Sequence, residues 1–397
     1  MTTLRYLCDR SRHIVCLPYS VENLHAMARD LGLSRGWFHD GRWPHYDMPA
    51  HRIEELTARC EVVSPRTILH VIRTGGGEGL VEAPRRATGR SADVVVIMKN
   101  QVNPAYGGAF VGATRAAARF GLTLRGAAPS VADDIDEQRA LIRRAVAARP
   151  SAIVLLPAHE SALDAAIEEA DALGVPVFHI VSKPLTSAWI NHVATDSVAI
   201  ARDIARHLFD HLGGSGDVVI MDGTPGAISS PQRHQGFVEA AAERPAIRIV
   251  ESVCGYLLRE PARAAAREVL RRYTRIDGML VANDLMAMGV VDVLKESGRT
   301  FPVASINGTP EAVAAIKAGA MLATASFDTL AFGELSVEAV ARYLRGEAVP
   351  REIILPTAII DRSNVGQWDK PYEARQAPSW DQAQSHWIGP MRRRTML

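Results

Sequence analysis

From residue 93 onwards, short apolar runs alternate with stretches in which apolar residues recur every three or four positions. Runs that are apolar throughout are typical of parallel strands buried on both faces of a sheet. They predict strands at residues 94–98, 122–126, 152–156, 175–180, 217–221, 247–252, 278–282, 302–306 and 322–326. The stretches between them predict helices, as at 137–149, 161–173, 197–212 and 332–346. This order predicts a doubly wound α/β domain.

Residues 75–92 interrupt this pattern with glycines, a proline and basic residues that show no apolar periodicity. Such a composition predicts a linker. It would separate a small N-terminal α+β domain at 1–74 from the α/β domain at 93–365. The remaining segment, 366–397, contains proline and little periodicity, and we expect it either to lie along the α/β domain or to be partly disordered.

The composition is that of a soluble globular protein, with 47% apolar residues, 22% charged residues and a formal net charge of +1. This balance favours neither nucleic acid nor an anionic membrane as a partner. Charged residues occupy the N-terminus where a secretory signal would need an apolar stretch, and no apolar run reaches the roughly 18 residues of a membrane span. We therefore expect a cytoplasmic protein. Four scattered cysteines predict no disulfide framework.

Polar residues follow many of the predicted strands directly. In open α/β sheets ligands bind beyond the carboxyl ends of the strands, so these residues are the first candidates for a site. Each one alone is equally typical of a helix cap or a turn. The residues that follow strands in this way are Lys99 to Asn103, His159, Asp222 to Thr224, Asn283, Asp284 and Asn307, and Asp196 follows the short stretch 193–195.

Five pieces of sequence carry a resemblance to a known family. They are NPAYGGAFVGA (103–113), HVATDSVAIARDIA (192–205), GTPGAISSPQRHQGF (223–237), DGMLVANDLMAMGVV (277–291) and INGTPEAVAAIKAGAMLATAS (306–326). With their order and spacing, the segment from 94 to about 364 resembles the ribose-type periplasmic sugar-binding family, whose fold is shared with the effector domains of the lactose-repressor family. The resemblance implies a two-lobed type I periplasmic binding fold, with two doubly wound parallel sheets joined by a hinge of three crossings. The first lobe would hold about 93–198 and 327–349, and the second about 199–326 and 350–365.

The resemblance also implies a function. It indicates a non-catalytic binding protein that holds a sugar or sugar derivative between its lobes and delivers it to an ABC permease, for which the periplasm is the expected location. A cytoplasmic ligand sensor, similar to a transcription regulator, is the alternative. The positions that the family would use are Asn103, Tyr106, Asp196, Arg233 and Asn283.

Four departures from the family affect the identity of the ligand. Asn307 replaces a frequent aspartate, Lys99 replaces a small polar residue, Pro157 with the nearby His159 replaces an asparagine, and Phe327 replaces a glutamine. Because a buried, unpaired cation is costly, Lys99 and Arg233 favour an anionic ligand such as a sugar acid or a sugar phosphate. If instead Lys99 points away from the ligand, a neutral pentose or hexose is expected.

Catalytic motifs are missing from the sequence. It contains no G-x-S-x-G, H-E-x-x-H or G-x-x-x-x-G-K-[ST] motif, so we predict neither an enzyme nor a cofactor.

Six of the thirteen histidines lie within the first 75 residues, but their spacing fits no standard zinc pattern, and we predict structural roles and no metal. Residues 20–41 superficially resemble a helix-turn-helix, although Gly36 to Phe38 would interrupt its second helix. The N-terminal segment instead resembles a family of small bacterial domains of unknown function. Its candidate functional residues are Trp37, His45, Tyr46 and Asp47, and the alternative is that 45–47 form a turn that packs its own domain.

Overall fold

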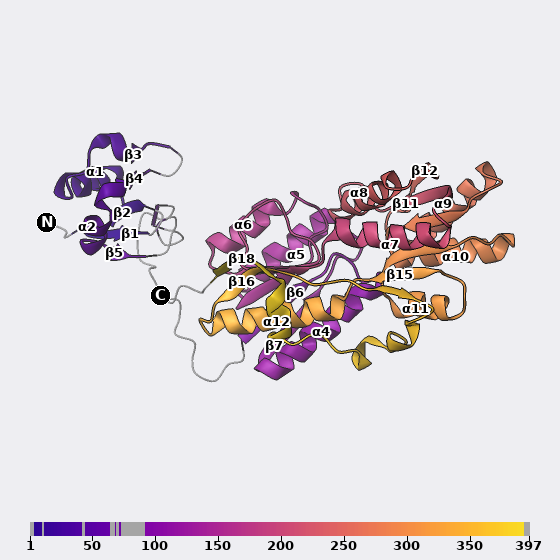
Figure 1. Cartoon of the computed structure of the whole chain (residues 1–397). Helices are drawn as coiled ribbons and strands as arrows, with labels where there is room; N and C mark the ends of the chain where they lie inside the picture. Colours follow the sequence, from indigo (N-terminus) through magenta and orange to yellow (C-terminus); the bar gives the residue numbers. More distant parts are fainter. Residues whose placement is uncertain are drawn as a thin grey trace. The chain divides into compact units, whose positions relative to one another are not determined.

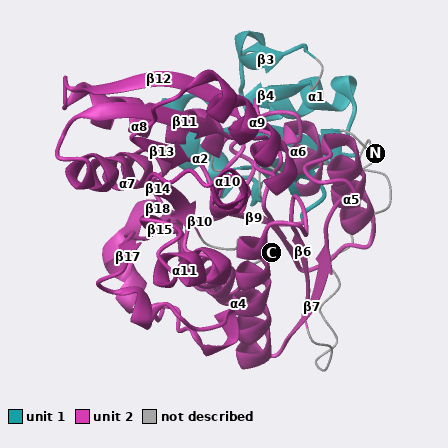
Figure 2. Cartoon of the chain, turned by 90° about the vertical axis from the view of Figure 1, so that its right-hand side faces the viewer, with its two compact units in different colours: residues 1–90, 171–174, 395–397 teal, residues 91–170, 175–394 magenta. Residues whose placement is uncertain are grey.

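The computed structural model describes residues 4–9, 12–41, 44–63, 68, 71–72 and 92–392. The chain forms two compact units, shown in Figures 1 and 2, one made of residues 1–90, 171–174 and 395–397 and the other of residues 91–170 and 175–394. Apart from Ala92, the predicted linker lies outside the described residues. None of the helices in the described ranges is both long and apolar enough to cross a membrane.

The N-terminal unit is built on a five-stranded sheet in the order β3-β4-β2-β1-β5. Its elements are β1 (Arg5–Cys8), β2 (His13–Leu17), α1 (Val21–Asp30), β3 (Phe38–His39), β4 (His45–Asp47), α2 (Ile53–Ala58) and β5 (Glu61–Val62). The Ser20 side chain caps α1 by accepting a hydrogen bond from the Asn23 amide. The alternative that residues 45–47 form a turn is wrong, because they form β4, which pairs with both β2 and β3.

The first lobe of the larger unit has a seven-stranded sheet in the order β18-β16-β10-β9-β8-β6-β7. Its strands are β6 (Ala92–Ile97), β7 (Leu122–Ala127), β8 (Ala152–Leu155), β9 (Val177–Ile180), β10 (His192–Ala194), β16 (Val349–Ile354) and β18 (Trp387–Arg392). Its helices are α4 (Pro104–Phe120), α5 (Ile135–Ala147), α6 (Asp164–Ala172) and α12 (Thr329–Leu344). Val94 and Val96 belong to the core on the α4 and α12 side, while Val95 and Ile97 belong to the core on the α5 and α6 side. Burial on both faces explains why the strands are continuous apolar runs.

The second lobe has a six-stranded sheet in the order β12-β11-β13-β14-β15-β17. Its strands are β11 (Gly216–Asp222), β12 (Ile247–Cys254), β13 (Gly278–Val281), β14 (Val303–Asn307), β15 (Ala323–Ser326) and β17 (Ile359–Asp361). Its helices are α7 (Ser197–His211), α8 (Ser229–Ala242), α9 (Arg259–Arg272), α10 (Asp284–Ser297) and α11 (Pro310–Lys317). All nine predicted strands are present, and the predicted two-lobed fold is confirmed.

The chain crosses between the lobes three times, after β10, after β15 and after β16. The predicted assignment of residues 350–365 to the second lobe is wrong for its first part. β16 pairs with β10 in the sheet of the first lobe, so the third crossing follows Ile354. Of the two alternatives for the tail, the structure shows it lying along the domain as far as Arg392, because β18 pairs antiparallel with β16.

Two glycines bring α4 and α12 close together on one face of the first sheet. A Cβ atom at Gly112 would lie 2.0 Å from the Leu330 carbonyl oxygen, and one at Gly333 would lie 1.9 Å from the Ala109 carbonyl oxygen. Any larger residue at either position would force the two helices apart. The close packing fixes the middle of α4, and the first turn of this helix carries residues of the candidate site.

Candidate functional site

The first lobe contributes a buried ion pair at the carboxyl ends of β6 and β7. Lys99 follows β6 and is 5% exposed, and its ammonium donates a hydrogen bond to the Asp133 carboxylate at 2.9 Å. Burial disfavours the charged ammonium, but the neighbouring Tyr106 and Asp133 outweigh burial and raise the pKa of Lys99. Lys99 therefore does not point out to solvent, and its charge is already balanced within its own lobe.

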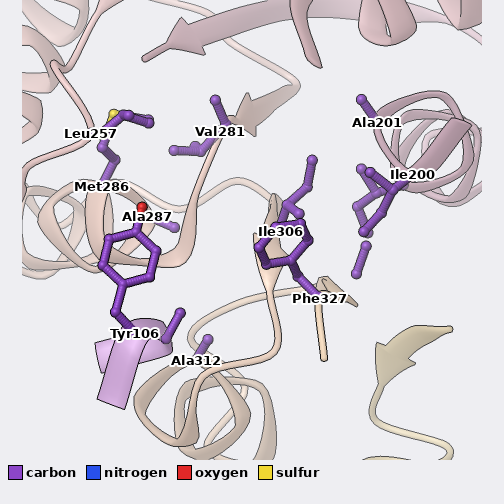
Figure 3. Close-up of a cluster of buried hydrophobic side chains, with 14 of the residues drawn as sticks. Tyr106, Ile200, Ala201, Leu257, Val281, Met286, Ala287, Ile306, Ala312 and Phe327 are labelled. Carbon is purple, nitrogen blue, oxygen red and sulfur yellow. The ribbon is translucent and has the colours of Figure 1, made fainter. Parts of the chain in front are cut away.

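Tyr106 extends from the first turn of α4 into the second lobe. Figure 3 shows its hydroxyl end pointing toward Met286 and Ala287, which belong to the second lobe. Burial raises the pKa of the Tyr106 hydroxyl, while the charges of Lys99 and Arg233 act in the opposite direction. Residues of both lobes thus share one buried cluster, so the two lobes are closed on each other.

The second lobe contributes Arg233, which lies on α8 and is 3% exposed. One guanidinium nitrogen donates to the Ala282 carbonyl oxygen, and the guanidinium carbon lies 5.1 Å from the centroid of the Phe327 ring. Its Nε atom is buried and forms no hydrogen bond. Burial lowers the pKa of Arg233 to about 10, although Tyr106 and Asp284 act against this shift. Arg233 thus retains a hydrogen-bonding group that a ligand can use.

Asn283 and Asp284 join α10 to the loops around it. The Asn283 side chain accepts from the Met286 amide at 2.8 Å and donates to the Leu257 carbonyl oxygen at 3.1 Å. Asp284 is fully buried and accepts hydrogen bonds from the Ser305, Thr309 and Thr324 hydroxyls and from the Thr309 amide. Burial raises the pKa of Asp284 even though all these donors act to lower it. Asp284 therefore holds the second lobe together at the base of the site.

Asn103 and Asn307 are both buried at strand or helix ends, as expected. Asn103 caps α4 by accepting from the Ala105 amide at 3.1 Å. Asn307 ends β14 with a φ of 147°, a conformation that favours glycine. A non-glycine residue held in such a conformation is a frequent feature of functional sites.

Two expected residues lie apart from this group. Asp196 is exposed, and its carboxylate caps α7 by accepting from the Val198 and Ala199 amides. His159 is half-buried, and its Nδ1 accepts from the amides of Ser161 and Ala162. The other ring nitrogen would lie 3.1 Å from a Cβ at Gly226, so His159 packs against the second lobe. Both residues thus serve local structure in this closed state.

The sequence did not indicate Asp133 as a member of the site. It lies in the loop between β7 and α5, 34 residues from Lys99, with a φ of 61°. Aspartate tolerates this left-handed conformation better than most residues do. The only available signal was an acidic residue after the second predicted strand.

The tail also reaches the place where the lobes meet. We call residues 368–375 the strap. The strap lines a hollow of about 480 Å³ together with Pro104 of the first lobe and Pro310 and Glu311 of the second. Arg375 in the strap donates to the Gly308 carbonyl oxygen of the second lobe at 2.9 Å.

The strap also contacts α4 of the first lobe. Arg115 of α4 donates to the Arg375 carbonyl oxygen at 2.9 Å. A Cβ at Gly108 would lie 2.7 Å from the Tyr372 ring, so Tyr372 is seated directly on α4. The strap therefore links the two lobes beside the site.

The N-terminal candidates divide between the two faces of their sheet. Tyr46 is buried in the core, and its hydroxyl bonds to His25 Nδ1 at 2.8 Å, which gives it a structural role. His45 and Asp47 lie on the opposite face, because side chains alternate along β4. Trp37 is 37% exposed at the end of a short 3-10 helix, with the Arg12 guanidinium 5.8 Å from its ring centroid.

The fold and the closed, polar interface between its lobes are those of a solute-binding protein. Residues 94–348 match the family model described as "Periplasmic binding protein domain", and the chain belongs to this family. Residues 11–74 match the model described as "Protein of unknown function (DUF4031)", which confirms the resemblance of the N-terminal segment to a domain of unknown function.

Curated relatives and solved structures agree with this assignment. The ribose import binding protein of Bacillus subtilis is 28% identical over 205 residues, which cover 52% of this chain and 67% of the relative. The D-apiose import binding protein of Actinobacillus succinogenes is 26% identical over 284 residues, covering 70% and 90%. A solved ABC transporter periplasmic solute-binding protein from Actinobacillus succinogenes, with bound D-allose, is similar with a TM-score of 0.67 and 23% identity, covering 70% of this chain and 99% of that chain.

Proposed function

We propose that the larger unit binds a neutral sugar or polyol between its lobes, without catalysis, as the substrate-binding component of an ABC-type import system. The observation that carries this proposal is the buried Arg233, whose Nε forms no hydrogen bond and whose guanidinium lies beside the Phe327 ring. A polyol offers adjacent hydroxyls to a guanidinium and an apolar face to an aromatic ring. The names of the relatives, which are import binding proteins for ribose and D-apiose, support the same ligand class.

The charges around the site support a neutral ligand over an anionic one. Lys99 forms an ion pair with Asp133, and Arg233 lies close enough to Asp284 for that carboxylate to stabilise its charge. Two cations and two carboxylates leave the site without net charge. An anion would bring an unbalanced charge into a buried environment, which is unfavourable. The hypothesis of an anionic ligand rested on Lys99 and Arg233 together, and the ion pair with Asp133 removes the contribution of Lys99.

A ligand screen on purified full-length protein tests this proposal. Ribose, allose, apiose, xylitol and myo-inositol would be compared with gluconate and ribose 5-phosphate by thermal shift, because a ligand that binds only the native state raises the melting temperature. We expect stabilisation by at least one neutral compound, followed by saturable binding in calorimetry. Stabilisation by the anions alone would contradict the neutral assignment. No binding to any compound of either set would contradict the sugar class.

The transport role and its location need a separate experiment. We propose that the protein meets an ABC permease on the outer side of the inner membrane, as the import functions of the named relatives suggest. Fractionation of cells that express a C-terminally tagged full-length chain tests the location. Recovery in the periplasm would support transport, whereas recovery in the cytoplasm would favour a ligand sensor.

A further inference from the structure

The register of the N-terminal sheet gathers histidines and a carboxylate from three neighbouring strands. In the antiparallel pair β2 and β4, His13 lies opposite Asp47, and in the pair β3 and β4, His39 lies opposite His45. His45 and Asp47 are two residues apart on β4 and share a face, so their cross-strand partners point to that face as well. The residue between them, Tyr46, is buried in the core on the other face.

Three of these side chains converge closely enough to share one ion. The ligand atoms of His13, His45 and Asp47 lie within 4.8 Å of one another. Zinc bonds to nitrogen and oxygen are about 2.0 to 2.2 Å long, so donor atoms around one ion lie somewhat more than 3 Å apart. Small side-chain rotations bring the three residues to that spacing. All three are half-buried, which leaves solvent access on one side.

The neighbouring groups orient the three residues as metal ligands are usually oriented. Asp9, whose side chain is fully buried, bonds to His13 Nδ1 at 2.7 Å and accepts from the His13 amide at 2.9 Å. A proton held on Nδ1 by this carboxylate leaves the Nε2 lone pair of His13 for a metal, as in carboxylate–histidine–metal arrangements. Neighbouring carboxylates and carbonyls of this kind are a regular part of metal sites.

One carboxylate oxygen of Asp47 has no hydrogen-bond donor. His39 Nε2 bonds to Asp47 Oδ2 at 3.0 Å and so fixes the carboxylate. The other oxygen, Asp47 Oδ1, is buried and forms no hydrogen bond, with His45 Nε2 3.6 Å away. A buried carboxylate oxygen without a donor is unfavourable unless something positive occupies the space beside it.

We propose that His13, His45 and Asp47 bind one divalent transition-metal ion of the zinc class in the N-terminal domain. Two imidazoles and one carboxylate suit zinc and ferrous iron, and three protein ligands leave at least one coordination position open for solvent or a substrate. This replaces the prediction of purely structural histidines. Spacing along the sequence gave no zinc pattern, because the ligands come from two strands whose pairing the sequence did not show.

The test is a metal titration of the tag-free full-length protein after treatment with a chelator. Zn²⁺ binding would be followed by calorimetry and Co²⁺ binding by its visible absorption, which reports the ligand type and coordination number. We expect one equivalent per chain with micromolar or tighter affinity. We expect H45Q and D47N each to lose at least about 100-fold in affinity. D9N should lose about 10- to 100-fold, as expected for a group that orients a ligand.

The matched control is H51Q, which alters an exposed histidine of the same domain outside the group. It should bind Zn²⁺ with unchanged affinity. Circular dichroism of each metal-free variant shows whether its fold is retained, and the partly exposed His13 offers H13Q if a β4 variant fails to fold. The proposal is overturned if the native protein shows no saturable binding, or if H45Q, D47N and H13Q bind as the native protein does.

Discussion

At the carboxyl ends of its strands, the first lobe places a buried cation beside a carboxylate, whereas the second lobe places one beside a carbonyl and an aromatic ring. Lys99 is bonded directly to Asp133, while Arg233 forms no direct ion pair among the described residues, although the charge of Asp284 acts on it from beyond bonding distance. Asp284, the buried carboxylate of the second lobe, is bonded to hydroxyls and an amide instead. The buried cation of the first lobe is thus paired without a ligand, whereas Arg233 in the second lobe retains an Nε donor that a ligand can satisfy.

The largest expected effect comes from breaking the ion pair of the first lobe. Lys99→Met leaves the Asp133 carboxylate without its partner, and removing one member of a buried pair typically costs about 3 kcal/mol or more. We expect a loss of about 3 kcal/mol in the free energy of unfolding, measured by urea denaturation. The double variant Lys99→Met with Asp133→Asn should recover most of this loss. If the double variant is no more stable than the single one, the pairing is not what stabilises this end of the sheet.

Acid should also destabilise the first lobe, because it favours protonation of a histidine that is buried in the neutral form. His179 on β9 is fully buried, and burial, with a further contribution from His192, lowers its pKa to about 3. Between about pH 6.5 and pH 3 the unfolded chain binds this proton and the folded chain does not, so stability falls as the pH is lowered through this range. Lowering the pH from 7 to 4.5 should cost about 2.5 kcal/mol from this residue alone.

The pH dependence is measured by urea denaturation of the native protein and of His179→Leu at both pH values. The variant should lose about 2.5 kcal/mol less than the native protein on acidification, whatever its stability at pH 7. His211→Gln, which alters an exposed histidine, is the control and should follow the native protein. An equal acid sensitivity in His179→Leu would show that other groups control the effect.

Substitution of Arg233 should not destabilise the protein, in contrast to substitution of Lys99. Arg233→Met removes a buried charge that has no directly bonded carboxylate, and Asp284 keeps its own hydrogen bonds, so we expect the ligand-free protein to remain as stable as the native one or to become more stable. The ligand, in contrast, loses a charge-assisted hydrogen bond worth about 2 kcal/mol, which is roughly 30-fold in affinity. Thermal denaturation and calorimetry on the same samples measure both quantities. A variant that is destabilised while it keeps its affinity would assign Arg233 to structure alone.

The sequence predicts some of the features behind these contrasts and not others. The strands of both lobes were predictable because burial on two faces leaves a continuous apolar run, as in residues 94–97. Arg233 and Asn283 were predicted as site residues from their positions within the quoted pieces, and the structure buries both in the second lobe. The ion pair was not, because Asp133 lies on another loop, and whether Lys99 is paired depends on side-chain geometry.

The short strands were harder to predict for a different reason. β10 has three residues and β4 has three, which is too short for a period of two to be distinguished. The same shortness hid the pairing of His13 with Asp47, and with it the proposed metal site. β16 was assigned to the wrong lobe because its partner β10 is distant in sequence and neither strand's residues indicate which strand it pairs with.

The smallest expected effect tests whether the two lobes act together through the strap. Arg375 donates to the Gly308 carbonyl oxygen of the second lobe, while its own carbonyl oxygen accepts from Arg115 of the first. Arg375→Ala removes one bond to the second lobe and leaves the ion pair between Lys317 and Asp369, as well as Lys99 and Arg233, intact. If the strap favours the closed state, the ligand must then supply more of the closing free energy, and its apparent affinity falls. One neutral-acceptor hydrogen bond of about 1 kcal/mol corresponds to roughly fivefold.

Calorimetry with the best neutral ligand, together with small-angle scattering of the ligand-free protein, separates the explanations. A fivefold loss of affinity with a larger radius of gyration would show that the strap holds the lobes closed. The lobes of the native protein would then already be closed before the ligand binds. Arg362→Ala, an exposed arginine of the same C-terminal region, should change neither quantity. If Arg375→Ala behaves as Arg362→Ala does, closure is driven by the ligand alone, and Arg233 rather than the strap decides when the lobes meet.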